Sequence, residues 1–125
     1  MNIEDRVELG LKFRKEGYSC SQCVLMALTD KLGIEREIAV RIGSGLGAGA
    51  SCGELCGAVN AIAIAEGLKS DNITPESKKI VMPKVSDLVS KFSKPFGGKV
   101  NCRDLKGKCG VPCEELISRA IRLAE

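Results

Sequence analysis

Cysteine is the residue type in this chain with the greatest capacity for chemistry. Seven of the 125 residues are cysteines and none is histidine. Any metal site must therefore be built from thiolates, with carboxylates as further ligands, while haem attachment through Cys-x-x-Cys-His and a Cys–His catalytic pair are excluded. Because seven is an odd number, the cysteines cannot all pair within the chain. They are Cys20, Cys23, Cys52, Cys56, Cys102, Cys109 and Cys113.

Four of these cysteines are predicted to lie at the starts of helices, directly after residues that cap helices. A helix N-terminus has unsatisfied N–H groups and partial positive charge, so a thiol placed there has its thiolate stabilised. We therefore take these four as candidate catalytic residues and, in a metal-binding interpretation, as candidate ligands. The caps are the boxes Ser19-Cys20-Ser21-Gln22 and Ser51-Cys52-Gly53-Glu54, Asn101 before Cys102, and Pro112 before Cys113.

The other three cysteines, Cys23, Cys56 and Cys109, are predicted to be auxiliary thiols. Each lies three or four positions from one of the four candidates, a spacing that puts two side chains on one helix face. Cys23 and Cys56 also fall on apolar stripes, where a cysteine is often just a small core residue. Cys109 lies in a Lys- and Gly-rich segment, where core packing explains it poorly. We expect them to act as resolving thiols, with core packing as the alternative for Cys23 and Cys56.

A run of glycines precedes the most apolar segment of the chain. Gly43-x-Gly45-x-x-Ala48 superficially matches a dinucleotide-binding fingerprint, but that fingerprint needs a preceding strand in a βαβ unit, and no strand is predicted. We expect the glycines to let the backbone turn sharply and pack close beside Cys52, or to point N–H groups at a bound anion or sulfur. The candidate cofactor-binding glycines are Gly45, Gly47, Gly49 and Gly53.

The hydrophobic pattern predicts an all-α, single-domain bundle of about five or six helices spanning residues 1–125, with the Gly-rich connection before the central helix. Hydrophobic residues make up 44% of the chain but aromatic residues only 3%, so the core must be aliphatic. We expect Pro83 to kink or split the helix that starts at Thr74-Pro75-Glu76. The remaining helices are predicted at Asn2–Glu16, Cys20–Leu32, Glu35–Ile42, Ser51–Leu68, Asn101–Leu105 and Cys113–Ala124.

Composition argues against several partners. The net charge is only +3 and aromatic residues that could stack on bases are nearly missing, so nucleic-acid binding is not expected. The charged start Met1–Arg6 lacks the apolar region of a signal peptide, and Ala58–Ala65 is far shorter than the ~20 residues that span a bilayer. We expect a soluble cytoplasmic protein without membrane partners, whose thiols are held reduced. A homodimer is possible, although no specific feature marks an interface.

The order and spacing of these residues resemble the C_GCAxxG_C_C family of redox-active proteins. The family core Cys-Gly-Ala-x-x-Gly has a counterpart in Cys52-Gly53-Glu54-Leu55-Cys56-Gly57, followed by Ala58, with Glu54 where the family usually has alanine. Tyr18–Gln22 resembles the start of the family pattern, and Cys102 and Cys113 resemble the third and fourth hallmark cysteines, with Cys109 as another candidate for the fourth. The resemblance implies a small, mostly helical protein with redox chemistry, and it supplies no substrate.

Two functions follow as expectations. The first is a thiol redox protein, such as a thiol-dependent oxidoreductase, in which some pair of Cys20, Cys52, Cys102 and Cys113 cycles between dithiol and disulfide with an unknown redox partner. The second is a binding module in which the same four thiolates hold an iron–sulfur cluster or zinc. Only one Cys-x-x-Cys spacing occurs, at Cys20 and Cys23, and it lies in a helical context rather than in a thioredoxin-like βαβ unit. A third, weaker interpretation is a structural helical protein with incidental cysteines.

Overall fold

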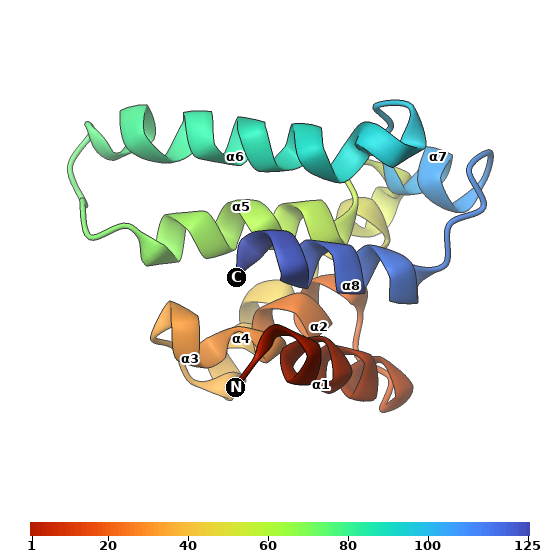
Figure 1. Cartoon of the computed structure of the whole chain (residues 1–125), viewed down its shortest axis with the longest axis horizontal. Helices are drawn as coiled ribbons and strands as arrows, with labels where there is room; N and C mark the ends of the chain where they lie inside the picture. The colour runs from red at the N-terminus through yellow and green to blue at the C-terminus, as the bar shows by residue number, and fades with distance from the viewer.

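The computed structural model describes all 125 residues, and the chain is all-α with no strand (Figure 1). The only β-type pairing is an isolated antiparallel bridge between Leu55 and Asn101. No helix is long and apolar enough to cross a membrane. Two short elements, the π-type turn η1 (Gly49–Gly53) and the 3-10 helix η2 (Lys94–Phe96), accompany the α-helices. The α-helices are α1 (Ile3–Lys15), α2 (Cys20–Ala27), α3 (Thr29–Leu32), α4 (Arg36–Gly43), α5 (Gly57–Lys69), α6 (Ser77–Ser93), α7 (Cys102–Lys106) and α8 (Cys113–Ala124).

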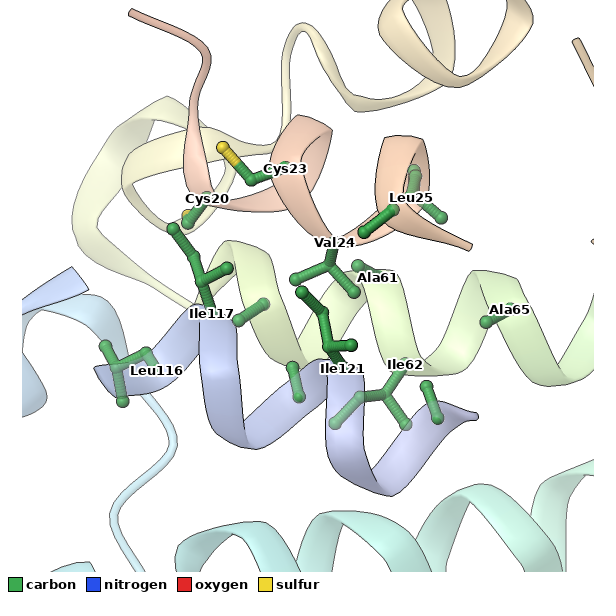
Figure 2. Close-up of a cluster of buried hydrophobic side chains, with 14 of the residues drawn as sticks. Cys20, Cys23, Val24, Leu25, Ala61, Ile62, Ala65, Leu116, Ile117 and Ile121 are labelled. Atoms are coloured by element: carbon green, nitrogen blue, oxygen red, sulfur yellow. The ribbon is translucent and has the colours of Figure 1, made fainter. Parts of the chain in front are cut away.

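Helices α2, α5 and α8 enclose the centre of the core. Figure 1 shows α5 and α8 between α6 on one side and α1 to α4 on the other. Small alanines on α5 and branched residues on α8 let these helices approach closely, and the buried apolar area stabilises them. Cys20 and Cys23, the first two cysteines of the chain, lie at one end of this core (Figure 2), so packing of the core fixes their positions. The fully buried side chains at its centre include Val24 of α2, Ala61 and Ile62 of α5, and Ile117 and Ile121 of α8.

The helices outnumber the predicted five or six. The predicted helix Cys20–Leu32 divides at Leu28, whose φ of −114° and ψ of 6° interrupt the helical backbone, into α2 and α3. The predicted helix from Thr74 starts three residues later, at Ser77. The Thr74 carbonyl accepts the Ser77 N–H, which forms a turn before the helix. Pro83 does not split α6. Because proline has no N–H, the carbonyl of Lys79, four residues earlier, lacks its helical hydrogen bond. Lys79 is exposed, so water can donate to this carbonyl instead.

The predicted helix start at Ser51 is wrong. Four consecutive residues, Ala48 to Ser51, have φ between 54° and 64°, which is left-handed backbone. Such a run is unfavourable for residues that carry a side chain. It is anchored by Gly49, whose carbonyl accepts the Glu54 N–H at 3.0 Å and whose Cα lies against the Glu54 backbone, where no Cβ would fit. The central helix α5 therefore begins six residues later than predicted, at Gly57.

A buried arginine ties the first helix to the end of the chain. Arg6 of α1 is 1% exposed and donates hydrogen bonds to both carboxylate oxygens of Asp30, at 2.5 and 3.0 Å. It also donates to the Ala27 carbonyl at 2.9 Å and to the Glu125 carboxylate at 3.2 Å. The guanidinium group of Arg6 thus joins three parts of the chain: α1, the α2–α3 junction and the end of α8.

Candidate functional site

One cavity brings together four of the seven cysteines. Its volume is about 430 Å³, and we call it the thiol cavity. The four thiols come from four separate segments: Cys20 from α2, Cys56 from the residue before α5, Cys102 from α7 and Cys113 from α8. The other lining residues are Arg14, Ser19, Ser44, Gly47, Ala48, Lys106 and Leu116.

Cys20 occupies its predicted place as the first residue of α2. The Gln22 side chain accepts the Ser19 N–H at 3.0 Å, as the predicted capping box requires. The Cys20 sulfur lies against Gly57, the first residue of α5. A Cβ built on Gly57 would lie 2.5 Å from that sulfur and 2.9 Å from the Leu46 carbonyl oxygen. The absence of a side chain at Gly57 therefore lets Cys20 reach the start of α5.

Backbone pairing places Cys56 beside Cys102. The Cys56 N–H donates to the Val100 carbonyl at 2.8 Å, and the Cys102 N–H donates to the Glu54 carbonyl at 2.7 Å. These two bonds flank the Leu55–Asn101 bridge. Cys56 is consequently the N-cap residue of α5, and Cys102 is the first residue of α7, as predicted.

Cys113 has a cation as its partner. It opens α8, as predicted, and its side chain is partly exposed. Lys106, the last residue of α7, donates a hydrogen bond to the Cys113 sulfur at 3.0 Å. This hydrogen bond is the main reason why the pKa of Lys106 is raised. A neighbouring ammonium group and a helix N-terminus both favour the negatively charged form of a thiol, which is the nucleophilic form.

Burial gives the deeper thiols a different character. It raises the pKa of the Cys56 thiol to about 11, outweighing the N–H groups of Val59 and Ala58 that face the sulfur without making a capping hydrogen bond. The pKa of Cys102 is raised by burial and by the charges of Cys20 and Cys113, against the lowering effect of Lys106. Among the four thiols of the cavity, Cys113 is the one that combines partial exposure with a hydrogen bond from a cation.

The remaining cysteines lie outside the thiol cavity. Cys52 is exposed in η1, where its carbonyl accepts a hydrogen bond from Arg103 at 3.2 Å. Its predicted position at a helix start is wrong, since the left-handed backbone precedes it. Cys109 is exposed, and Cys23 is fully buried, with its thiol 3.5 Å from the Tyr18 carbonyl and its pKa raised by burial to about 12.

The structure thus brings together three of the four predicted site residues and adds Cys56, which we had predicted as an auxiliary thiol. The sequence holds a signal for it. Cys56-Gly57-Ala58 contains the alanine of the Cys-Gly-Ala core, where Cys52-Gly53-Glu54 has glutamate. When Cys56 is aligned with the first cysteine of the core, Ala61 stands where the core has its last glycine. Each of the two alignments, from Cys52 or from Cys56, therefore departs from the core at one position.

The glycine run packs closely against the start of α2, and the carbonyl of its Gly49 also accepts a hydrogen bond from the Cys52 thiol at 3.4 Å. A Cβ on Gly47 would lie 2.7 Å from the Ser19 Cβ, and one on Gly43 would lie 2.9 Å from the Gln22 nitrogen. Among the glycines predicted to bind a cofactor, Gly47 lines the thiol cavity, whereas Gly45, Gly49 and Gly53 do not.

Replacing Gly57 by alanine is expected to lower the free energy of unfolding by about 1–3 kcal/mol, because the added methyl group overlaps the Cys20 sulfur and a backbone oxygen. Urea unfolding measures this change. Gly67→Ala is the matched control in the same helix. A Cβ there meets nothing within 4 Å, so this variant should be more stable by up to about 1 kcal/mol. Equal effects of the two substitutions would contradict the close contact at Gly57.

The chain matches the model of one protein family. The model of the family described as "Putative redox-active protein (C_GCAxxG_C_C)" matches residues 18–125. No curated protein and no solved structure matches the chain. The matched region holds all seven cysteines and everything that lines the thiol cavity except Arg14. The chain therefore belongs to the C_GCAxxG_C_C family of redox-active proteins.

Proposed function

We propose that the chain is a thiol redox protein whose active cysteines are Cys20, Cys56, Cys102 and Cys113. The observation that carries this proposal is the convergence of these thiols, from four separate segments, on one cavity with Lys106 at Cys113. Core packing alone does not explain a partly exposed cysteine that receives a hydrogen bond from an ammonium group.

The partial exposure of Cys113 and its hydrogen bond from Lys106 support an order of reaction among the thiols. Cys113 attacks a sulfur of an oxidised partner and forms a mixed disulfide with it. Cys102, which lines the same cavity, then attacks the Cys113 sulfur, which releases the reduced partner and leaves a Cys102–Cys113 disulfide. Cys20 and Cys56 are the two thiols that then remain in the cavity, and they form the second pair. Each disulfide formed in the cavity accounts for two electrons.

Counting thiols tests this assignment. We expect oxidation of the monomer to form two disulfides within the thiol cavity and to leave Cys23, Cys52 and Cys109 as the three free thiols of the seven. Cys56→Ser should form only one of these disulfides. The matched control Cys52→Ser should still form two, because Cys52 lies outside the cavity.

The measurement is alkylation of free thiols before and after oxidation, with peptide mapping of each disulfide. If Cys52→Ser lost a disulfide and Cys56→Ser kept both, the assignment of Cys56 would be wrong and the alignment of Cys52 with the family core would be restored.

A thiolate-bound iron–sulfur cluster or zinc is the second candidate function, because the thiol cavity has the four cysteines that such a site needs. The side chains do not fit a metal ion as they are placed, since no three Cys, Asp or Glu side chains form a group that could hold one. Lys106 also opposes it, because an ammonium group 3.0 Å from the Cys113 sulfur would repel a metal cation there. Stoichiometric iron and sulfide, or zinc, in anaerobically purified protein would overturn the dithiol proposal.

A further inference from the structure

The thiol cavity is positively charged. Two cationic side chains line it, Arg14 of α1 and Lys106 of α7, and no carboxylate does. Arg14 donates from Nη1 to the Tyr18 carbonyl at 3.1 Å, while its Nη2 has no hydrogen-bond partner in the protein. The nearest acidic partner of Arg14 is Glu114, whose carboxylate lies 3.8 Å from Nε, is mostly exposed and lies outside the cavity lining.

The two cations lie close enough to affect each other. The charge of Arg14 lowers the pKa of Lys106, against the larger raising effect of Cys113. Two like charges that face one cavity repel each other, and a negatively charged ligand placed between them removes that repulsion. Apart from the Cys113 sulfur that Lys106 already contacts, the acidic group near both cations is the mostly exposed Glu114 carboxylate, which lies outside the cavity lining.

We propose that the thiol cavity takes small disulfides that carry a carboxylate group, with Arg14 as the residue that binds the carboxylate. The proposal rests on the thiol redox function above and adds the class of substrate. The volume of about 430 Å³ suits a small molecule rather than a protein segment. The partly exposed Cys113 would be the first thiol that such a molecule meets.

The reaction balances as an exchange of thiols. The Cys113 thiolate attacks one sulfur of R–S–S–R, which forms the Cys113–S–S–R bond and releases one RS⁻. The Cys102 thiol loses its proton and attacks the Cys113 sulfur, which forms the Cys102–Cys113 disulfide and releases the second RS⁻. The two protein thiols lose two electrons, the substrate disulfide gains them, and the two released thiolates take up protons to give two RSH.

Three small disulfides of different charge test the proposal: 3,3′-dithiodipropionate, bis(2-hydroxyethyl) disulfide and cystamine, which are anionic, neutral and cationic. The rate at which each oxidises the reduced protein is divided by its rate with dithiothreitol, because the three leaving thiols differ in intrinsic reactivity. We expect the normalised rate to be roughly tenfold or more higher for the anionic disulfide than for the cationic one, with the neutral one between them.

Substitution of Arg14 identifies the source of that preference. Arg14→Gln should reduce the preference for the anionic disulfide by roughly three- to tenfold, seen as a higher half-saturating concentration of that disulfide, while Arg14→Lys should largely restore it. Arg122→Gln changes the net charge equally on the exposed surface and should leave the preference unchanged. Thermal unfolding of each variant confirms that it is folded.

The outcomes separate the two proposals. If all three disulfides oxidise Cys113 with equal normalised rates, or if Arg14→Gln keeps the full preference, the assigned substrate class is wrong and the thiol redox function stands. If no disulfide oxidises Cys113, the thiol redox function itself is overturned, and the substrate class with it.

Discussion

Replacing Cys113 by serine is expected to slow the reduction of small disulfides by the protein by roughly three orders of magnitude, because this substitution removes the thiol that attacks. Cys113 combines partial exposure, the first position of α8 and the hydrogen bond from Lys106, whereas burial raises the pKa values of Cys56 and Cys102. The rate is measured by stopped-flow mixing of the reduced protein with disulfide. Alkylation mapped by peptide mass should show Cys113 as the fastest-reacting thiol of the cavity.

Substitutions of lysine separate the effect of the cation from the effect of the thiol. Lys106→Met should slow alkylation of Cys113 by roughly tenfold, because it removes the charge beside the sulfur. Lys108→Met, two residues further along in the exposed segment before α8, is the control and should leave the rate unchanged. Unchanged alkylation in Lys106→Met would show that the ammonium group does not activate Cys113.

Replacing Arg6 by alanine is expected to lower the free energy of unfolding by about 3 kcal/mol or more. The substitution leaves the space of a buried side chain, deprives the buried Ala27 carbonyl of its donor and releases Asp30 and Glu125 from α1. Urea unfolding measures the loss. Arg122→Ala is the matched control, since Arg122 joins α8 to Glu4 of α1 through an exposed ion pair and should change stability little.

The ion pair between Arg6 and Asp30 predicts a dependence of stability on pH. Arg6 holds the pKa of Asp30 at about 2, below its ordinary value of 3.8. As the pH falls, the unfolded chain takes up a proton at this carboxylate before the folded chain does, so the contribution of Asp30 to stability is full above pH 3.8 and lost between pH 3.8 and 2. The stability difference between the wild type and Asp30→Asn should therefore shrink over that range. A constant difference would contradict the ion pair.

Several helix starts could be predicted from the residues that immediately precede them. The helix starts at Cys20, Cys102 and Cys113 are confirmed. The capping box of Ser19 and Gln22 acts within one turn of α2, whereas the Asn101 side chain makes no capping hydrogen bond at α7. The pattern at Ser51 satisfied the same rule and failed. There the backbone is held by contacts between Gly49 and Glu54 and by pairing of Glu54 and Cys56 with residues about 46 positions away, from Val100 to Cys102.

The composition of the candidate site depended on the same distant contacts. The sequence predicted Cys20, Cys102 and Cys113 as site residues, and all three line the thiol cavity. Cys56 could not be distinguished from a core residue by periodicity, because it is both buried and part of the cavity. The role of Lys106 could not be predicted, since Gly107, Gly110 and Pro112 separate it from the helix that Cys113 begins. Only the turn between α7 and α8 brings Lys106 to the Cys113 sulfur.

The origin of the four thiols in separate segments couples oxidation to folding. Cys20 and Cys102 are 82 positions apart in the chain, yet both line the thiol cavity. The fold therefore supplies a high effective concentration of one thiol at another, and unfolding removes it. By thermodynamic linkage, any disulfide that the folded state favours also stabilises the folded state. Unfolding of the reduced protein should therefore shift the reduction potential of these thiols to more positive values, by about 30 mV for each 1.4 kcal/mol of coupling between folding and disulfide formation.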